Sequence, residues 1–245
     1  MSRNFEILNR EPAPRSEFRP ARPVRPNGNG HSRDHRAAAE DEIEKLVQRV
    51  FILPGASKAP AVVAFCGVDQ GSGCSWVCAR ASEALAGQIP GKVCIIDANL
   101  RSPSLDRHFR FETGAGFAEA IKESRPIREF ARPVRGNKLW LITSGAVGRD
   151  ANGALNPARL RARFAELRGE FDYVLIDTPP VSSYSDAALL GQFADGVILI
   201  IGSNFTRREP ARIAKESLEA AKVVVLGAVL NRRTYPIPEA LYQRL

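Results

Sequence analysis

A glycine-rich segment between a strand pattern and a helix pattern is the first part of this sequence that could do chemistry. The apolar run AVVAFC leads into GVDQGSGCS over residues 67–75, and helical spacing follows at once. Glycines at such a turn let backbone amides point toward an anion at a helix amino terminus. We therefore predict a phosphate-binding loop, with a simple tight turn as the alternative. The residues expected to surround the phosphates are Gly71, Ser72, Gly73, Cys74 and Ser75.

One position departs from the usual phosphate-binding pattern. In GxxxxGK[ST] the lysine reaches the β and γ phosphates, and the hydroxyl ligates Mg²⁺. Here Cys74 replaces the lysine, whereas Ser75 keeps the hydroxyl. A charge-assisted hydrogen bond to phosphate contributes about 1.5–3 kcal/mol, so we expect binding to weaken by about tenfold to a hundredfold. Phosphoryl transfer should suffer more, because positive charge near the γ phosphate stabilises the transition state.

Two further strand patterns end in aspartate. The run KVCIID ends in Asp97, with Arg101 shortly after it, and the run YVLID ends in Asp177. Open α/β sheets build their sites at the carboxyl ends of strands. Because Mg²⁺ prefers carboxylate, hydroxyl and phosphate oxygens, we predict a magnesium site made of Ser75, Asp97 and Asp177.

The four cysteines carry a weaker signal. Cys66, Cys74, Cys78 and Cys94 lie in or beside apolar segments, which suits buried thiols in a reducing compartment better than disulfides. Cys74 and Cys78 would share a helix face, so zinc is an alternative, but there is no CxxC pair and no histidine nearby. A thiol at a helix amino terminus can have a lowered pKa, which would make Cys74 redox-sensitive.

Strand and helix patterns alternate over most of the chain. The expected strands are AVVAFC, KVCIID, LWLIT, YVLIDT, GVILII and VVVLGAVL. Asn156 followed by Pro157 predicts a helix start. This alternation predicts an α/β fold with helices around a mostly parallel central sheet. With a phosphate-binding loop after its first strand, the domain resembles a P-loop NTPase-like three-layer α/β/α domain. The apolar helix stripes that would cover the sheet are Val77, Ala81 and Leu85; Leu160, Phe164 and Leu167; and Ala214, Leu218 and Ala221.

Composition separates this domain from its ends. Residues 1–38 are rich in Arg, Pro, Gly and Asn and have few clustered apolar groups, which predicts a disordered basic tail. From Glu40 onward the apolar spacing predicts a short amphipathic helix before the core. The ordered domain is expected over 39–233, with a short C-terminal tail over 234–245.

The net charge and the lack of long apolar runs constrain the surroundings. No run approaches the roughly 18 residues that cross a bilayer, so we expect a cytoplasmic protein. A net charge of +8 fits nucleic acid, anionic lipid or an acidic partner equally, and solvated arginine-rich loops would also produce it. Charge alone therefore selects no partner.

At this point the sequence resembles a known family. VCIIDANLRSPSL and FDYVLIDTPPV look like the second acidic motif and the Walker B motif of the bacterial tyrosine autokinases of exopolysaccharide export, within the MinD and ParA-like P-loop ATPases. GFAEAI, LNPARL, SDAALL, TRRE and VLNR are similar to further segments of that family. The resemblance covers roughly residues 40–233.

The resemblance implies roles for matching residues. Ser75 and Asp177 would organise Mg²⁺ with ATP or ADP, and Asp97 would be the catalytic acid near the γ phosphate. Asn231 would contact the adenine edge, and Arg101 would lie near the phosphates or at a subunit contact. Besides the loop lysine, two more groups that the family uses for catalysis or phosphate binding are missing. Asn99 replaces the second aspartate of the DxD run, and Asp69 stands where MinD and ParA-like proteins carry a signature lysine.

Features outside the nucleotide site are weak too. The family's leading helix often carries a Glu, Arg, Arg pattern that supports ring-like oligomers, and this chain offers Glu42, Lys45 and Gln48. Active members commonly end in a tyrosine-rich tail, whereas this chain ends with Tyr235 and Tyr242 only. A homo-oligomer is thus possible but is supported less than in the family, and two tyrosines do not form the cluster that is phosphorylated in active members.

Three functions follow as hypotheses. The leading one is a regulatory or scaffolding protein of exopolysaccharide export that binds nucleotide poorly and is recruited to the inner face of the membrane by a membrane-anchored polysaccharide co-polymerase. The second is an active tyrosine autokinase in which Arg101, Arg207 or Arg208 replaces the lysine. The third is a ParA or MinD-like partitioning ATPase, against which Asp69 argues. We expect no nucleic-acid partner, since the basic tail has few aromatic residues for base stacking.

Overall fold

The computed structural model of the chain describes residues 31–53, 59–112, 114–146, 155–203 and 205–232. Within these ranges seven strands form one sheet in the order β3-β4-β2-β5-β1-β6-β7. Only the β3–β4 pair is antiparallel, and the other neighbours are parallel. The strands are β1 (Val62–Gly67), β2 (Val93–Asp97), β3 (Arg132–Arg135), β4 (Leu139–Ile142), β5 (Tyr173–Thr178), β6 (Gly196–Gly202) and β7 (Val225–Asn231).

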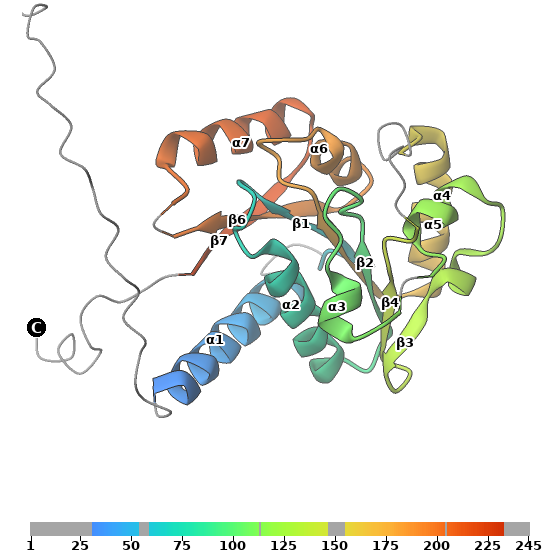
Figure 1. The fold of residues 1–245 in the computed structure, drawn as a ribbon, viewed down its shortest axis with the longest axis horizontal. Helices are drawn as coiled ribbons and strands as arrows, with labels where there is room; N and C mark the ends of the chain where they lie inside the picture. The colour runs from blue at the N-terminus through green and yellow to red at the C-terminus, as the bar shows by residue number, and fades with distance from the viewer. Residues whose placement is uncertain (1–30, 54–58, 113, 147–154, 204, 233–245) are drawn as a thin grey trace, which may run out of the picture.

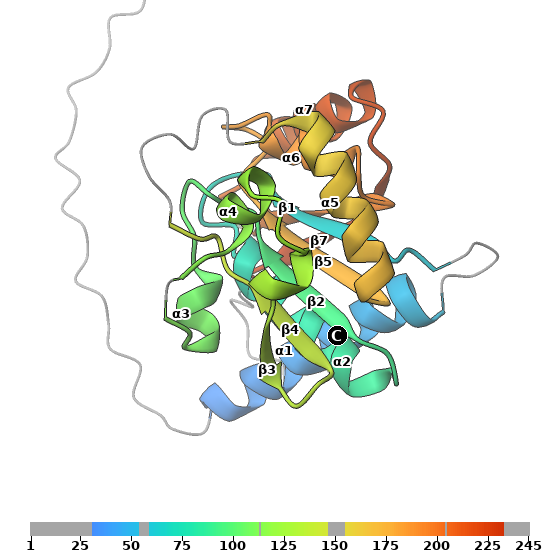
Figure 2. The same cartoon turned by 90° about the vertical axis from the view of Figure 1, so that its right-hand side faces the viewer.

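Helices cover both faces of this sheet (Figures 1 and 2). One face packs against α1 (His31–Val47), its continuation η1 (Gln48–Ile52), α2 (Cys74–Gln88) and α3 (Leu105–Phe109). The other packs against α4 (Phe117–Lys122), η2 (Ile127–Phe130), α5 (Pro157–Glu170), α6 (Asp186–Gly191) and α7 (Arg208–Ala220). The predicted three-layer α/β/α fold is therefore confirmed.

The central strands are apolar throughout because both of their faces are covered. In β1, Val63 and Phe65 belong to the core against α1 and α2, while Val62, Ala64 and Cys66 belong to the core on the opposite face. The predicted helix stripes face the same two cores, with Ala221 partly buried and the others buried. The helix start at Asn156 is also confirmed, since its Oδ1 accepts from the amides of Ala158 and Arg159 at 3.0 and 3.2 Å.

The first helix begins earlier than the sequence suggested. It starts at His31, so the tail boundary expected at residue 38 falls inside α1. The run 37–39 is Ala-Ala-Ala, and alanine has the highest helix propensity, which favours extension toward the N-terminus. The rest of the expected tail, 1–30, and the expected C-terminal tail lie outside the described residues.

Neither β3 nor α3 was predicted from the sequence. β3 contains Pro133 and two arginines, and it pairs with β4 at the edge of the sheet through an irregular register, where proline is tolerated. α3 is only one and a half turns long, and its amide donors are satisfied by an acid from another element, as described below. Neither element has an apolar periodicity of its own.

The start of β1 depends on Asp195, which precedes β6. Its Oδ2 accepts hydrogen bonds from the amides of Ala61 and Val62, both at 2.8 Å, and Arg168 of α5 donates to Oδ1 at 2.8 Å. Partial burial alone would raise the pKa of Asp195, but these donors together lower that pKa below its usual 3.8. The carboxylate therefore fixes the start of β1 against β6 and α5.

Asp195→Asn should destabilise the fold in a pH-dependent way. A carboxyl with a lowered folded pKa stabilises the native state above its unfolded pKa, and this contribution disappears as pH falls through the folded value. We expect the variant to lose about 0.5–1 kcal/mol at pH 7, because solvent screens this half-exposed carboxylate, and the difference from the natural chain to shrink below pH 4. Urea unfolding at both pH values measures this. Equal losses at the two pH values would contradict it, and Glu44→Gln on the exposed side of α1 serves as the control.

Candidate functional site

The loop between β1 and α2 has the conformation that an anion-binding turn needs. Gly71 and Gly73 both have φ of 83°, in the left-handed region that glycine adopts without strain. A Cβ on Gly73 would also lie 2.3 Å from Nδ2 of Asn231. That Nδ2 donates to the carbonyl of Ser72 at 2.9 Å, so β7 holds the loop in place. The first amides of α2 after Gly73 have no hydrogen-bond acceptor within the helix, so they can donate to an anion.

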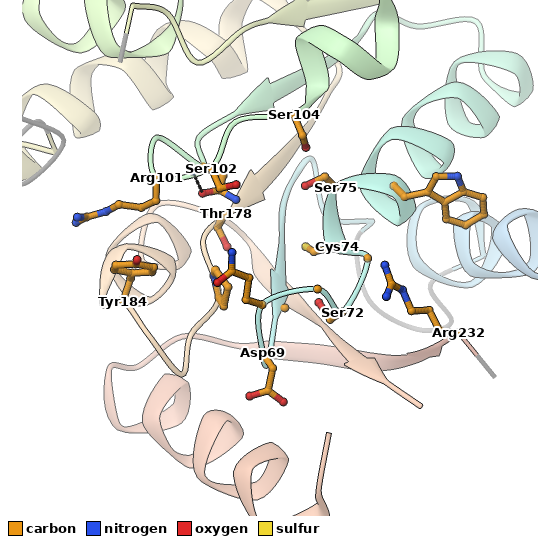
Figure 3. Close-up of a pocket in the computed structure, with 17 residues that line it drawn as sticks. Asp69, Ser72, Cys74, Ser75, Arg101, Ser102, Ser104, Thr178, Tyr184 and Arg232 are labelled. Carbon is orange, nitrogen blue, oxygen red and sulfur yellow. Dashed lines mark hydrogen bonds between the residues drawn. The ribbon is translucent and has the colours of Figure 1, made fainter. Parts of the chain in front are cut away.

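The loop forms one wall of a cavity of about 240 Å³. All five loop residues predicted to bind phosphate line it, as does Arg101 (Figure 3). Asn231 does not line the cavity, and its predicted contact with an adenine edge stays a prediction. The lining also includes residues to which the sequence assigned no role: Gln70, Trp76, Ser102, Ser104, Thr178, Pro180, Tyr184 and Arg232.

The two strand-end aspartates lie side by side. Asp97 of β2 and Asp177 of β5 are direct partners in the parallel register, and Asp177 pairs on its other side with Phe65 of β1. Both acids are completely buried and neither lines the cavity, but Cys74 and Ser75 line it and lie beside the Asp177 carboxyl. The fold thus brings the loop and both acids together, as the sequence predicted.

The Asp97 carboxyl accepts hydrogen bonds from three backbone amides. Its Oδ2 accepts from the amides of Ser104 and Leu105, both at 2.9 Å, and its Oδ1 accepts from the amide of Asn99 at 3.2 Å. Burial raises the pKa of Asp97 to about 6, and the three amides limit that rise. The carboxylate caps the start of α3, so its predicted catalytic role stays a prediction.

Asp177 has no such support. Neither of its carboxyl oxygens has a hydrogen-bond partner of ordinary geometry among the described residues. Burial, together with the neighbouring Asp97, raises the pKa of Asp177 to about 8, and the nearby Ser75 hydroxyl and Cys74 thiol limit that rise. Because the two carboxyls interact, the retained proton belongs to the pair, and we place it on Asp177, which lacks donors. Two unpaired carboxyl oxygens beside a serine hydroxyl are a donor set that suits Mg²⁺.

Cys74 does not have the reactive thiol that its place at the helix start suggested. Burial raises its pKa well above the usual 9.0, and the nearby Asp177 raises it further. The expectation of a lowered pKa is therefore wrong, because burial and the neighbouring Asp177 carboxyl both favour the neutral thiol. Among the described residues no group of three or more His, Cys, Asp or Glu side chains could hold a metal ion, so the zinc alternative gains no support.

The arginines proposed as substitutes for the lysine lie in different places. Arg101 lines the cavity, but its Nε donates to Oδ2 of Asp186 at 3.2 Å, and its guanidinium lies 4.6 Å from the ring centroid of Tyr184. Arg207 and Arg208 are exposed at the start of α7 and do not line the cavity. Arg232 does line it and was missed, although the motif VLNR contains it. Asn231 in the same motif was assigned a role only through the family resemblance.

A glycine loop between β1 and α2, with acids ending β2 and β5 of a mostly parallel sheet, defines a P-loop fold of the ParA and MinD kind. Comparison with known proteins supports this class. No family model matches the chain. In the described part of the chain, no helix combines the length and apolar character required to span a bilayer.

The sequence relatives are bacterial tyrosine-protein kinases. The chain is 32% identical over 140 residues to tyrosine-protein kinase YwqD of Bacillus subtilis, covering 57% of this chain and 59% of that kinase. It is 27% identical over 177 residues to tyrosine-protein kinase CpsD of Streptococcus agalactiae, covering 71% and 75%. The match thus spans about six tenths of the length of the Bacillus relative. The predicted resemblance to this family is confirmed.

Solved structures show the same fold. The kinase domain of Escherichia coli tyrosine kinase ETK matches with a TM-score of 0.73 and 22% identity, covering 90% of this chain and 88% of that one. The septum site-determining protein MinD from Pyrococcus horikoshii, complexed with Mg-ADP, matches with a TM-score of 0.60 and 19% identity, covering 75% and 76%. At these identities the likeness shows the fold alone.

Asp177→Asn should stabilise the protein increasingly as pH rises. The folded state binds a proton on Asp177 that the unfolded chain releases near pH 3.8, so this group destabilises the native state progressively between about pH 4 and 8. The variant removes that penalty, and we expect a gain above about 1 kcal/mol at pH 8 that is smaller at pH 5. Urea unfolding without Mg²⁺ measures it, with exposed Asp41→Asn as control. A gain that does not change with pH would contradict the assignment.

Cys74 should react slowly with a thiol reagent in the native protein. Because burial and Asp177 keep the thiol protonated at neutral pH, we expect labelling of Cys74 at pH 7 to be slower than in the urea-unfolded chain. Mass spectrometry of the labelled peptides at successive times measures the two rates. Faster labelling in the native chain would show an activated thiol.

Proposed function

We propose that this chain is a tyrosine-kinase-like P-loop protein of exopolysaccharide export that binds Mg²⁺ with ATP or ADP weakly and acts as a regulatory or scaffolding component. The observation that carries the proposal is the uncharged, half-buried Cys74 thiol at the lysine position of an otherwise intact anion cradle. The cradle, the Ser75 hydroxyl and the Asp177 carboxyl support cation and phosphate binding. The missing charge argues against efficient phosphoryl transfer.

The energetic argument concerns the γ phosphate. A loop lysine would place a positive charge where the transition state for phosphoryl transfer gathers negative charge, and a neutral thiol supplies none. Arg101, the substitute on the wall near Ser102, is engaged by Asp186 and Tyr184. Asp69 adds a negative group to the cavity wall instead of a lysine. Each of these differences weakens transfer more than it weakens binding.

The partner and the location come from the resemblance. We propose that the protein is cytoplasmic and is brought to the inner face of the membrane by a membrane-anchored polysaccharide co-polymerase. Contact between copies would use the leading helix, where Glu42 and Lys45 form an exposed ion pair at 2.7 Å. An exposed pair of this kind contributes little stability, so it leaves both charges available to a partner chain.

An active tyrosine autokinase is the alternative function. It would need a cation that reaches the β and γ phosphates without help from Arg207 or Arg208, which do not line the cavity. A ParA or MinD-like partitioning ATPase is favoured less, because the negatively charged Asp69 on the cavity wall stands where that class has a signature lysine. The two alternatives predict tighter Mg-ATP binding than our proposal does.

Restoring the lysine should restore nucleotide binding. We expect isothermal calorimetry to show weak or undetectable binding of Mg-ATP to the natural chain, and Cys74→Lys to tighten it by about tenfold to a hundredfold because a charge-assisted phosphate contact returns. Cys74→Met is the matched control, since it adds similar length without charge and should not tighten binding. Tight binding by the natural chain, with phosphate appearing on Tyr235 or Tyr242, would instead establish an active kinase.

A further inference from the structure

The cavity carries positive charge at two ends, and the two ends differ. Arg101 and Tyr184 lie on one side of the loop, and Trp76 and Arg232 lie on the other, beside the start of α2 (Figure 3). The first pair follows β2 and β5, where the γ phosphate of a triphosphate is expected. The second pair follows the loop and β7.

Arg232 is positioned by the backbone next to the loop. It directly follows β7 and has a φ of 58°, which is unusual for a residue with a side chain. The preceding residue, Asn231, donates to Ser72, and its carbonyl accepts from the amide of Ser203 at 2.8 Å. Nε of Arg232 would lie 3.7 Å from a Cβ built on Gly73. The side chain of Arg232 therefore lies close to Gly73, at the start of α2.

The charge of Arg232 is available to a ligand. Within the described ranges no carboxylate forms an ion pair with Arg232, in contrast to Arg101, which pairs with Asp186. Arg232 is exposed and lines the cavity. A guanidinium in this setting can bind a phosphate through two parallel hydrogen bonds.

Trp76 supplies an aromatic surface beside this charge. It is the second residue after Cys74, it is 39% exposed, and it lines the same cavity. The guanidinium of Arg80, one turn further along α2, lies 5.8 Å from its ring centroid. An exposed tryptophan on a phosphate cavity suits stacking with a nucleobase, which contributes about 1–3 kcal/mol and depends little on which base is present.

We propose that Arg232 and Trp76 form the principal nucleotide-recognition subsite of this chain, binding a nucleoside diphosphate through its base and the phosphates nearest the base. The inference rests on the proposed function, in which the cradle still binds nucleotide weakly. The γ phosphate adds little affinity, because the charge that would bind it is absent at Cys74 and Arg101 is engaged elsewhere. Diphosphates and triphosphates therefore bind alike, and the base is read with low selectivity.

The test follows nucleotide binding at Trp76 itself. The sequence has two tryptophans, so Trp140→Phe leaves Trp76 as the only indole reporter. We expect Mg-ADP and Mg-ATP to quench its fluorescence with dissociation constants within about threefold of each other. Arg232→Gln should weaken both by about tenfold, Arg232→Lys should weaken them less, and Arg101→Gln should change them less than Arg232→Gln does. Calorimetry with Trp76→Ala, which removes the reporter, should show a similar loss.

Control variants distinguish a loss of nucleotide binding at Arg232 from a loss of folding and from failure of the proposed function. Arg49→Gln, an exposed change of the same charge outside the cavity, should leave both constants unchanged, and thermal unfolding should show that Arg232→Gln remains folded. ATP binding more than tenfold tighter than ADP, or Arg101→Gln costing more than Arg232→Gln, would overturn the inference. If the natural chain binds too weakly to measure, the series is repeated in Cys74→Lys, where an unchanged affinity in Arg232→Gln overturns the inference while the proposed function stands.

Discussion

A carboxyl group buried without hydrogen-bond donors at the end of β5 is the feature on which this site depends. Asp177 is completely buried, and both of its oxygens lack partners among the described residues. In low dielectric such a group must hold a proton or a cation. Because a thiol rather than an ammonium lies beside it, the proton is retained near neutral pH. Under the proposed function, binding of Mg²⁺ would compete with that proton, so replacement of the loop lysine would affect metal binding as well as phosphate binding.

Local hydrogen-bond donors make the two neighbouring acids differ in pKa. Asp97 and Asp177 occupy matching positions on adjacent strands, yet three backbone amides reach Asp97 and none reaches Asp177. The difference arises because the chain after β2 turns back to begin α3 over Asp97, whereas the chain after β5 continues into Pro179 and Pro180, which have no amide hydrogen. Equivalent sequence signals thus produce one capping carboxylate and one available ligand.

The sequence predicted what local patterns determine and missed what distant contacts determine. The six apolar strands and the helix start at Asn156 follow from residue type and spacing, and they locate the loop and both acids at one edge of the sheet. The raised pKa of Cys74 could not be predicted, because it depends on burial in the folded chain and then on Asp177, more than a hundred positions away. Arg232 was missed for the same reason, since only the pairing of β7 with β6 carries it to the loop. Trp76 was adjacent to the motif and could have been noticed.

The combination of retained and lost groups indicates what the site still does. An unpartnered buried carboxyl costs stability, and an asparagine in its place would remove that cost without disturbing the strand. A cavity that binds nothing gives no physical reason for Asp177, Ser75 and two left-handed loop glycines to lie together beside an exposed arginine. Under the proposed function the retained groups would bind cation and phosphate, while the groups that would drive transfer are the ones replaced. Ligand binding uncoupled from phosphoryl transfer is the chemistry consistent with both halves of this pattern.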